Sequence, residues 1–175
     1  MSRTIVAFSG PRACGKSTIA EKLCSEYGYT RVAFADAIRL IASSLNPTSA
    51  QDRLFLADVG QALRACVPDF STLAMEHRLH TLGGPIVIED VRFPIELEYC
   101  RSIGAFTVRF EIDRDTQIKR LGGRESDLKN LVELIDCEDE KKGLEAKDWD
   151  LKIDAVGDFN KIAAAIHERV NEAFV

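Results

Sequence analysis

Short apolar runs alternate with longer segments of helical period along the chain. Four of these runs, at residues 4–8, 30–33, 86–88 and 105–111, are rich in β-branched and aromatic residues, as buried strands are. Residues 151–153 form a weaker candidate for a fifth strand. Alternation of such runs with helical segments is typical of βαβ units, so the pattern predicts a parallel sheet.

Helices are predicted between these runs. In residues 16–27 and 158–174, apolar side chains recur on one face, as in helices that cover a core. A further helix is expected over residues 94–103. Residues 36–82 contain no strand candidate and are long enough for two or three helices.

Residues 114–150 differ from the rest of the chain. They are highly charged, poor in apolar residues and include the pair Gly122-Gly123. This composition favours a mobile element over a part of the core. With 175 residues, of which 46% are hydrophobic, the chain is expected to form one domain, residues 1–175, with a substantial core.

Composition excludes several classes of protein. The net charge of -5 argues against a binder of polymeric nucleic acid that uses a broad basic surface. No run reaches the roughly 18 apolar residues of a membrane span, and the N-terminus lacks a signal-peptide pattern. The five cysteines are odd in number and widely spaced, which predicts reduced thiols in a cytoplasmic protein.

The strongest chemical signal is the sequence GPRACGKS at residues 10–17, which matches the phosphate-loop pattern GxxxxGK(S/T). It follows a predicted buried strand and opens a predicted helix. Glycines there allow backbone turns that aim N–H groups at an anion, and the helix N-terminus adds partial positive charge. The lysine can reach the β- and γ-phosphates of ATP. The predicted ATP-binding residues of this segment are Gly10, Arg12, Ala13, Cys14, Gly15, Lys16, Ser17 and Thr18.

A pair of carboxylates follows the apolar run at residues 86–88. Ligands of parallel sheets lie beyond the carboxyl ends of the strands, so Asp90 is expected near the phosphate loop. Together with the hydroxyl of Ser17, Asp90 is predicted to hold Mg²⁺. Glu89 either assists at the metal or has only a structural role, and the sequence leaves both possibilities open.

Residues 87–98 (VIEDVRFPIELE) resemble the DVRFPNE-type segment of phage deoxynucleoside monophosphate kinases. These enzymes belong to the nucleoside-monophosphate kinase group, to which dephospho-coenzyme A kinases and one class of phosphomevalonate kinases are related. Residues 34–39 (FADAIR) resemble the family's FADPLK-like stretch. Residues 60–64 resemble its QxxGTxxxR-like segment without the Gly-Thr pair, and residues 124–127 (RESD) stand where members show an H-x-S-E-like motif.

The resemblance implies a fold and separate roles for two regions of the chain. The expected fold is a P-loop NTPase three-layer α/β/α sandwich, with a five-stranded parallel sheet of order 2-3-1-4-5, helices on both faces and a small lid. Residues 36–82 would bind the acceptor monophosphate, and residues 114–150 would form the lid.

The resemblance also implies roles for individual residues. Arginine suits such a site because its planar fork grips phosphate through two hydrogen bonds. The implied acceptor-binding residues are Asp36, Arg39, Gln61, Arg64 and Arg92. Arg114 would contact ATP, Gly157 would contact its adenine, and Arg120 and Arg124 would act in catalysis with Lys16 and Arg92.

The function implied is transfer of the ATP γ-phosphoryl group to a deoxynucleoside monophosphate, with Mg²⁺ as cofactor. The enzyme would be a monomer or homodimer in the cytoplasm, or in the host cytoplasm if it is viral. The alternatives are a kinase of another phosphorylated metabolite such as dephospho-coenzyme A, and a nucleotide-dependent switch. An inactive homologue is the remaining alternative, since two of the family's segments are altered.

Overall fold

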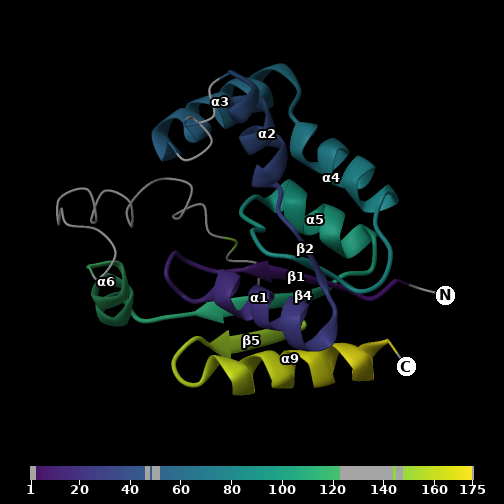
Figure 1. Ribbon diagram of the computed structural model, residues 1–175, viewed down its shortest axis with the longest axis vertical. Helices are drawn as coiled ribbons and strands as arrows, with labels where there is room; N and C mark the ends of the chain where they lie inside the picture. The colour runs from purple at the N-terminus through teal and green to yellow at the C-terminus, as the bar shows by residue number, and fades with distance from the viewer. Residues whose placement is uncertain (1–2, 46–47, 49–51, 123–143, 145–147, 175) are drawn as a thin grey trace. The chain divides into compact units, whose positions relative to one another are not determined.

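A five-stranded sheet in the order β2-β3-β1-β4-β5 organises the fold (Figure 1). The strands are β1 (Ile5–Ser9), β2 (Thr30–Val32), β3 (Ile86–Ile88), β4 (Phe106–Glu111) and β5 (Leu151–Asp154). β1 pairs in parallel with β3 and β4, and β4 pairs in parallel with β5. The predicted fold class and strand order are therefore confirmed. This computed structural model describes residues 3–45, 48, 52–122, 144 and 148–174.

Helices cover both faces of the sheet (Figure 1). They are α1 (Lys16–Tyr27), α5 (Pro94–Ser102) and α9 (Phe159–Ala173), whereas α6 (Arg114–Gly122) lies past the end of β4. On one face, α1 and α9 bury a core that includes Phe8 and Phe110. The rings of these two residues meet edge to face, with centroids 5.0 Å apart. α5 lies on the opposite face, with Leu97 and Cys100 buried.

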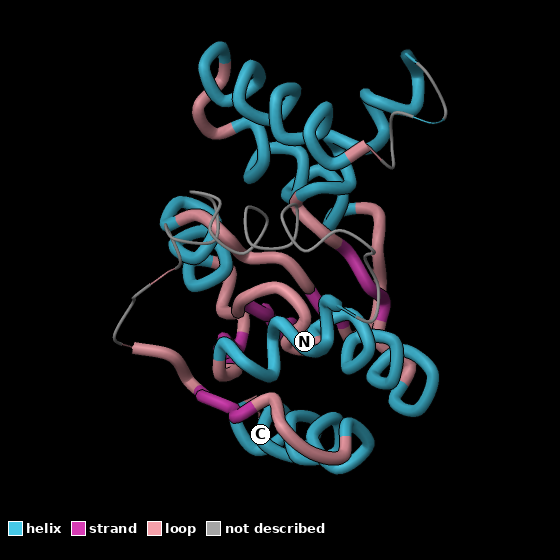
Figure 2. Tube along the Cα trace, turned by 90° about the vertical axis from the view of Figure 1, so that its left-hand side faces the viewer, coloured by secondary structure: helices cyan, strands magenta, loops and turns pink. Residues whose placement is uncertain are grey.

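The chain divides into two compact units. One comprises Met1–Arg31 with Gly84–Val175 and carries the sheet, and the other is Val32–Gly83. The second unit is helical (Figure 2), with α2 (Ala35–Leu45), α3 (Arg53–Cys66) and α4 (Phe70–His80). Its bounds are close to those of the region, residues 36–82, expected to bind the acceptor.

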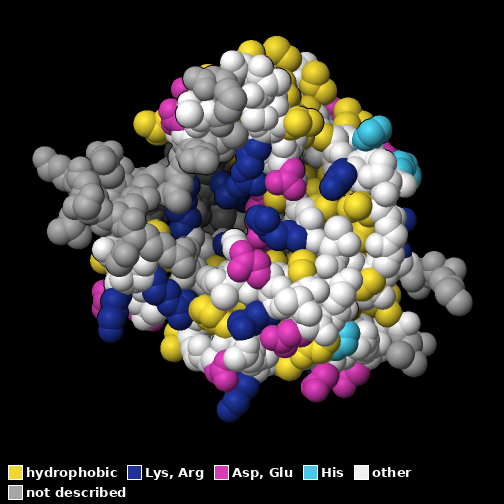
Figure 3. Space-filling model, in the orientation of Figure 1, with side chains coloured by type: hydrophobic (Ala, Val, Ile, Leu, Met, Phe, Trp, Pro, Cys, Tyr) yellow, Lys and Arg dark blue, Asp and Glu magenta, His cyan; other side chains and the backbone are white. Residues whose placement is uncertain are grey.

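Charged and apolar side chains are distributed differently on the two units. Acidic and basic side chains are interspersed over the sheet-containing unit on the face that Figure 3 shows. The helical unit carries apolar side chains on its surface, and Leu40, Leu45 and Leu54 are each at least 70% exposed. No described helix is long and apolar enough to cross a membrane.

The structure differs from the sequence prediction in the charged region at residues 114–150. Its first nine residues form α6, in which Gln117 and Leu121 are buried. Leu121 packs against Ala13 and Ile118. The helix was not predicted because so few of its residues are apolar. Residues 123–143 and 145–147, on which most of the predicted lid falls, lie outside the described residues.

Candidate functional site

The loop between β1 and α1 requires glycine at two positions. Gly10 has φ 151°, and a Cβ atom there would lie 2.7 Å from the carbonyl oxygen of Phe110 in β4. Gly15 has φ 95°, and a Cβ atom there would lie 2.7 Å from Cζ of Phe159 at the start of α9. Ala13 also adopts a left-handed conformation, with φ 58°. Repeated left-handed turns of this kind form anion-binding concavities from backbone N–H groups.

Lys16 is folded back onto this loop. Its ammonium group donates hydrogen bonds to the carbonyl oxygens of Gly10 at 2.6 Å and Pro11 at 2.8 Å. The Sγ atom of the buried Cys14 lies 3.4 Å from the same nitrogen. The N-cap residue of α1 is Gly15, which has no side chain that could cap the helix. The loop therefore combines the Lys16 cation with a helix N-terminus, where backbone N–H groups favour an anion.

A glycine-to-alanine pair tests this packing. We expect Gly15→Ala to abolish ATP binding and to destabilise the fold by about 1–3 kcal/mol, because the new methyl group overlaps Phe159. Gly104→Ala is the matched control: Gly104 also has positive φ, 72°, but has nothing within 4 Å of the added Cβ. It is expected to lose about 1 kcal/mol through backbone strain alone and to bind ATP normally. Urea unfolding and ATP titration measure both effects, and equal losses of ATP affinity in the two variants would contradict the packing argument.

α6 is attached to the phosphate loop by two side chains. Gln117 Nε2 donates to the carbonyl oxygen of Arg12 at 3.1 Å. Arg120 donates to the carbonyl oxygens of Ala13, at 3.2 Å, and Ala155, at 2.8 Å. The guanidinium carbon of Arg120 also lies 5.4 Å from the centroid of the Phe159 ring. Arg120 thus joins the phosphate loop to the segment between β5 and α9, in which Gly157 has φ 127°.

The segment after β3 is held by a buried carboxylate. Glu96 is 3% exposed, and its Oε2 atom accepts hydrogen bonds from the backbone N–H groups of Arg92, at 2.9 Å, and Phe93, at 3.1 Å. The side chain of Arg92 is exposed, and Asp90 is 7% exposed. Burial raises the pKa of the Cys100 thiol in α5, and the nearby carboxylates of Glu96 and Asp90 raise it further.

Removing the Glu96 carboxylate is expected to loosen this segment. Glu96→Ala leaves two backbone N–H groups without their acceptor, which costs about 1–3 kcal/mol of stability. Because the backbone that carries Arg92 would no longer be fixed, the variant should also bind a phosphorylated acceptor more weakly while ATP affinity is retained. Glu98→Ala, at an exposed position of the same helix, is the control and should change neither quantity. Urea unfolding and separate titrations of the two substrates measure the difference, and identical behaviour of the two variants would count against a role for Glu96.

Glu89 has different surroundings from its neighbour Asp90. One oxygen of Glu89 forms an ion pair with Arg31, which is 42% exposed at the side chain. Its other oxygen, Oε2, is buried and has no hydrogen-bond partner among the described residues. The ion pair accounts for Glu89 as a structural group.

The oxygen donors beside the loop suit Mg²⁺. Ser17 lies exposed in the first turn of α1, and Asp90 follows the strand next to β1. Hydroxyl and carboxylate oxygens are the donors that this hard cation prefers. Within the described residues, no three histidine, cysteine or acidic side chains form a metal-binding group. Mg²⁺ in phosphate-loop enzymes is held largely by nucleotide phosphates and water, so a hydroxyl and one carboxylate are a sufficient donor set.

The helical unit gathers its own polar side chains. Asp36 Oδ2 accepts from the backbone N–H of Ala33 at 2.8 Å, and Oδ1 accepts from Arg39 at 3.0 Å. At Gly60 in α3, a Cβ atom would lie 3.0 Å from Ile38 of α2 and 3.2 Å from a guanidinium nitrogen of Arg64. The glycine thus allows a close approach of α2 and α3 and leaves room for Arg64.

The remaining predicted residues are placed as follows. Gln61 is exposed, and Thr18 is half-buried in the first turn of α1. Arg114 is the first residue of α6, next to Asp113, whose pKa is lowered because its carboxylate accepts a hydrogen bond from Thr116. Arg124 lies outside the described residues.

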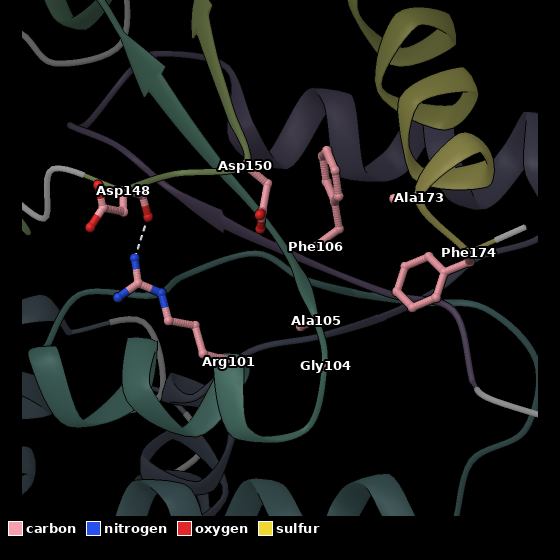
Figure 4. Close-up of a pocket in the computed structure, with 8 residues that line it drawn as sticks. All are labelled: Arg101, Gly104, Ala105, Phe106, Asp148, Asp150, Ala173 and Phe174. Atoms are coloured by element: carbon pink, nitrogen blue, oxygen red, sulfur yellow. Dashed lines mark hydrogen bonds between the residues drawn. The ribbon is translucent and has the colours of Figure 1, made fainter.

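A cavity of about 560 Å³ lies away from the phosphate loop (Figure 4). Residues 104–106, where β4 begins, line it, together with the last turn of α9. In Figure 4, Arg101 reaches from α5 toward the backbone oxygen of Asp148, with Phe106 and Phe174 across the cavity. Because the phosphate loop follows the carboxyl end of the neighbouring parallel strand β1, this cavity lies at the other end of the sheet and outside the site.

Comparison with known proteins supports the fold. No family model matches the chain, and no curated protein matches it. Among solved structures, TT1252 from Thermus thermophilus is 18% identical, with a TM-score of 0.64 and 98% of each chain covered. Shikimate kinase from Aquifex aeolicus is 11% identical, with a TM-score of 0.60 and 98% of each chain covered. A gluconokinase from Sinorhizobium meliloti is 14% identical, with a TM-score of 0.59, over 98% of this chain and 93% of its own. At these identities, the comparisons show a shared fold.

Proposed function

We propose that the chain is an ATP-dependent kinase that transfers the γ-phosphoryl group to a small phosphorylated acceptor, a deoxynucleoside monophosphate. The observation that carries the proposal is the phosphate loop, in which glycine is sterically required at two positions and the ammonium group of Lys16 donates to the carbonyl oxygens of Gly10 and Pro11. Shikimate kinase and gluconokinase, which share the fold, are kinases by name. The identity of the acceptor rests on the resemblance of residues 87–98 to deoxynucleoside monophosphate kinases.

On the donor side, the loop would bind the ATP phosphates. The ammonium group of Lys16 would leave the carbonyl oxygens of Gly10 and Pro11 and donate hydrogen bonds to oxygens of the β- and γ-phosphates instead. Arg120, which contacts Ala155 and Phe159, would border the adenine together with Gly157. This assigns Arg120 to nucleotide binding as well as to the catalytic role that the resemblance implies.

Ser17 and Asp90 would hold Mg²⁺, which supplies positive charge to the β- and γ-phosphates when it is bound. Lys16 would add further positive charge where the transferred group becomes more negative. Phosphoryl transfer of this kind needs positioning and charge neutralisation, and no covalent intermediate on the protein.

On the acceptor side, arginines would hold the monophosphate in line with the donor. Arg92 extends from a backbone segment that Glu96 fixes, so the starting point of its side chain is set before the acceptor binds. Arg39 is oriented by Asp36, and Arg64 lies over Gly60. We propose that Arg92 binds the acceptor phosphate, and that Arg39, Arg64 and Gln61 are the acceptor-binding residues of the helical unit.

A panel of acceptors tests the proposal. ADP release from Mg²⁺-ATP would be measured with the common deoxynucleoside and ribonucleoside monophosphates, dephospho-coenzyme A, shikimate and gluconate. We expect strong turnover with one or a few deoxynucleoside monophosphates. Turnover only with dephospho-coenzyme A or an unphosphorylated acid would assign a different acceptor. ATP binding with no turnover on any acceptor would contradict the proposal.

A further inference from the structure

Arg109 lies beside the base of the phosphate loop. It occupies the middle of β4, opposite Ser9, which is the last residue of β1 and directly precedes Gly10. Arg109 Nη1 donates a hydrogen bond of 2.9 Å to Ser9 Oγ. Ser9 is 2% exposed and Arg109 is half-buried. A half-buried arginine in the middle of a strand is uncommon, because the guanidinium group must lose part of its hydration.

The side chain of Arg109 points to the α5 side of the sheet. Its neighbours Val108 and Phe110 belong to the core under α1 and α9. Successive side chains of a strand point to opposite faces, so Arg109 faces away from α1. The segment that carries Asp90 and Arg92 leads directly into α5.

Trp149 supports the guanidinium group from a second direction. The guanidinium carbon lies 5.9 Å from the centroid of the Trp149 ring, within range of a cation–π interaction. Trp149 is itself held on both sides. Asp150 Oδ2 accepts hydrogen bonds of 2.7 Å from both the backbone N–H and the hydroxyl of Thr107, and Arg101 donates to the backbone oxygen of Asp148. Arg109 is therefore held in a defined orientation before any ligand arrives.

We propose that Arg109 is an acceptor-binding arginine, which contacts the monophosphate of the acceptor at the phosphate loop. This inference rests on the proposed kinase function and extends its acceptor site by a residue that neither the motif nor the family resemblance supplies. Ligands of parallel sheets bind at the carboxyl ends of the strands, and Arg109 is level with the end of β1. The ATP phosphates would bind on the α1 side of the sheet, where Lys16 and the N-terminus of α1 lie. Arg109, on the α5 side, is instead placed to bind the acceptor monophosphate. The segment of Asp90 and Arg92 lies on the same side.

The single tryptophan of the sequence makes this inference measurable. Because Trp149 contacts Arg109, its fluorescence should change when dAMP, dGMP, dCMP or dTMP binds. In Arg109→Met, we expect the Kd and KM of the accepted monophosphate to rise about 10- to 100-fold through loss of charged hydrogen bonds, while the Kd of ATP stays unchanged. Arg109→Lys keeps the positive charge but lacks the planar guanidinium group, so it should recover part of the affinity for the monophosphate. Arg169→Met is the control, because Arg169 is exposed on α9, on the opposite face of the sheet, and this variant should bind the monophosphate normally.

The outcomes separate this inference from the function on which it rests. If the wild-type protein phosphorylates a monophosphate and both Arg109 variants bind that monophosphate with the wild-type Kd, the inference is overturned and the kinase proposal stands. Equal weakening of ATP and monophosphate binding in Arg109→Lys would also overturn it, because it would indicate a structural role at Ser9. If the wild-type protein binds ATP but none of the four monophosphates, the proposed function fails and the inference fails with it.

Discussion

Lys16→Ala is expected to lower kcat/KM by at least about 10³-fold, the largest effect of any single substitution in the chain. The ammonium group lies at the phosphate loop, where it donates to the carbonyl oxygens of Gly10 and Pro11. Its removal takes away positive charge at the point where negative charge increases during transfer. The stability of the fold should change little, because the side chain is only partly buried. Steady-state kinetics and urea unfolding measure the two quantities.

Lys22→Ala is the control for this substitution. Lys22 lies in the same helix, α1, and its ammonium group contacts Asn160 on the surface. Its loss should leave kcat/KM unchanged. If Lys16→Ala retained substantial turnover, or if both variants lost activity equally, the phosphate loop could not be the catalytic centre.

Asp90→Asn is expected to have the second-largest effect, a loss of about 10²- to 10³-fold in kcat. Asparagine keeps the volume of this buried side chain but removes the negative charge that would hold Mg²⁺ beside Ser17. The Mg²⁺ concentration that gives half of the maximal rate should therefore rise. A titration of the rate with Mg²⁺ at saturating ATP and acceptor measures both effects.

Glu89→Gln is the matched control because the two carboxylates are adjacent. Glu89 is paired with Arg31, so its neutralisation should cost about 1 kcal/mol of stability, with the partly exposed arginine left to water. Its Mg²⁺ requirement should match that of the wild-type protein. A normal Mg²⁺ requirement in Asp90→Asn, with a raised one in Glu89→Gln, would exchange the roles of the two residues.

Much of the fold could be predicted because its strands are strongly apolar. The runs at residues 4–8 and 86–88 correspond to strands β1 and β3, and helix α1 has the predicted bounds. α6 could not be predicted in this way, because it is attached through polar groups. Gln117 and Arg120 donate to loop carbonyls more than 100 positions earlier in the chain, and no local pattern indicates such partners.

In the candidate site, too, some residues could be predicted from the sequence and others could not. The positions of Gly10, Gly15 and Lys16 follow from a local motif whose spacing is dictated by backbone geometry. Arg109 and Glu96 could not be identified as functional from the sequence, since each depends on the folded chain. Arg109 meets Ser9 only when β4 pairs with β1, and Glu96 reaches the N–H groups of Arg92 and Phe93 only in the turn before α5.

The fate of the γ-phosphoryl group tests the central claim most directly. ATP labelled at the γ-phosphate would be incubated with Mg²⁺, the protein and each deoxynucleoside monophosphate, and the labelled products would be separated. We expect the label in a deoxynucleoside diphosphate, and none there with Lys16→Ala. Label only in inorganic phosphate, whichever monophosphate is present, would contradict phosphoryl transfer and would identify a nucleotide hydrolase or switch.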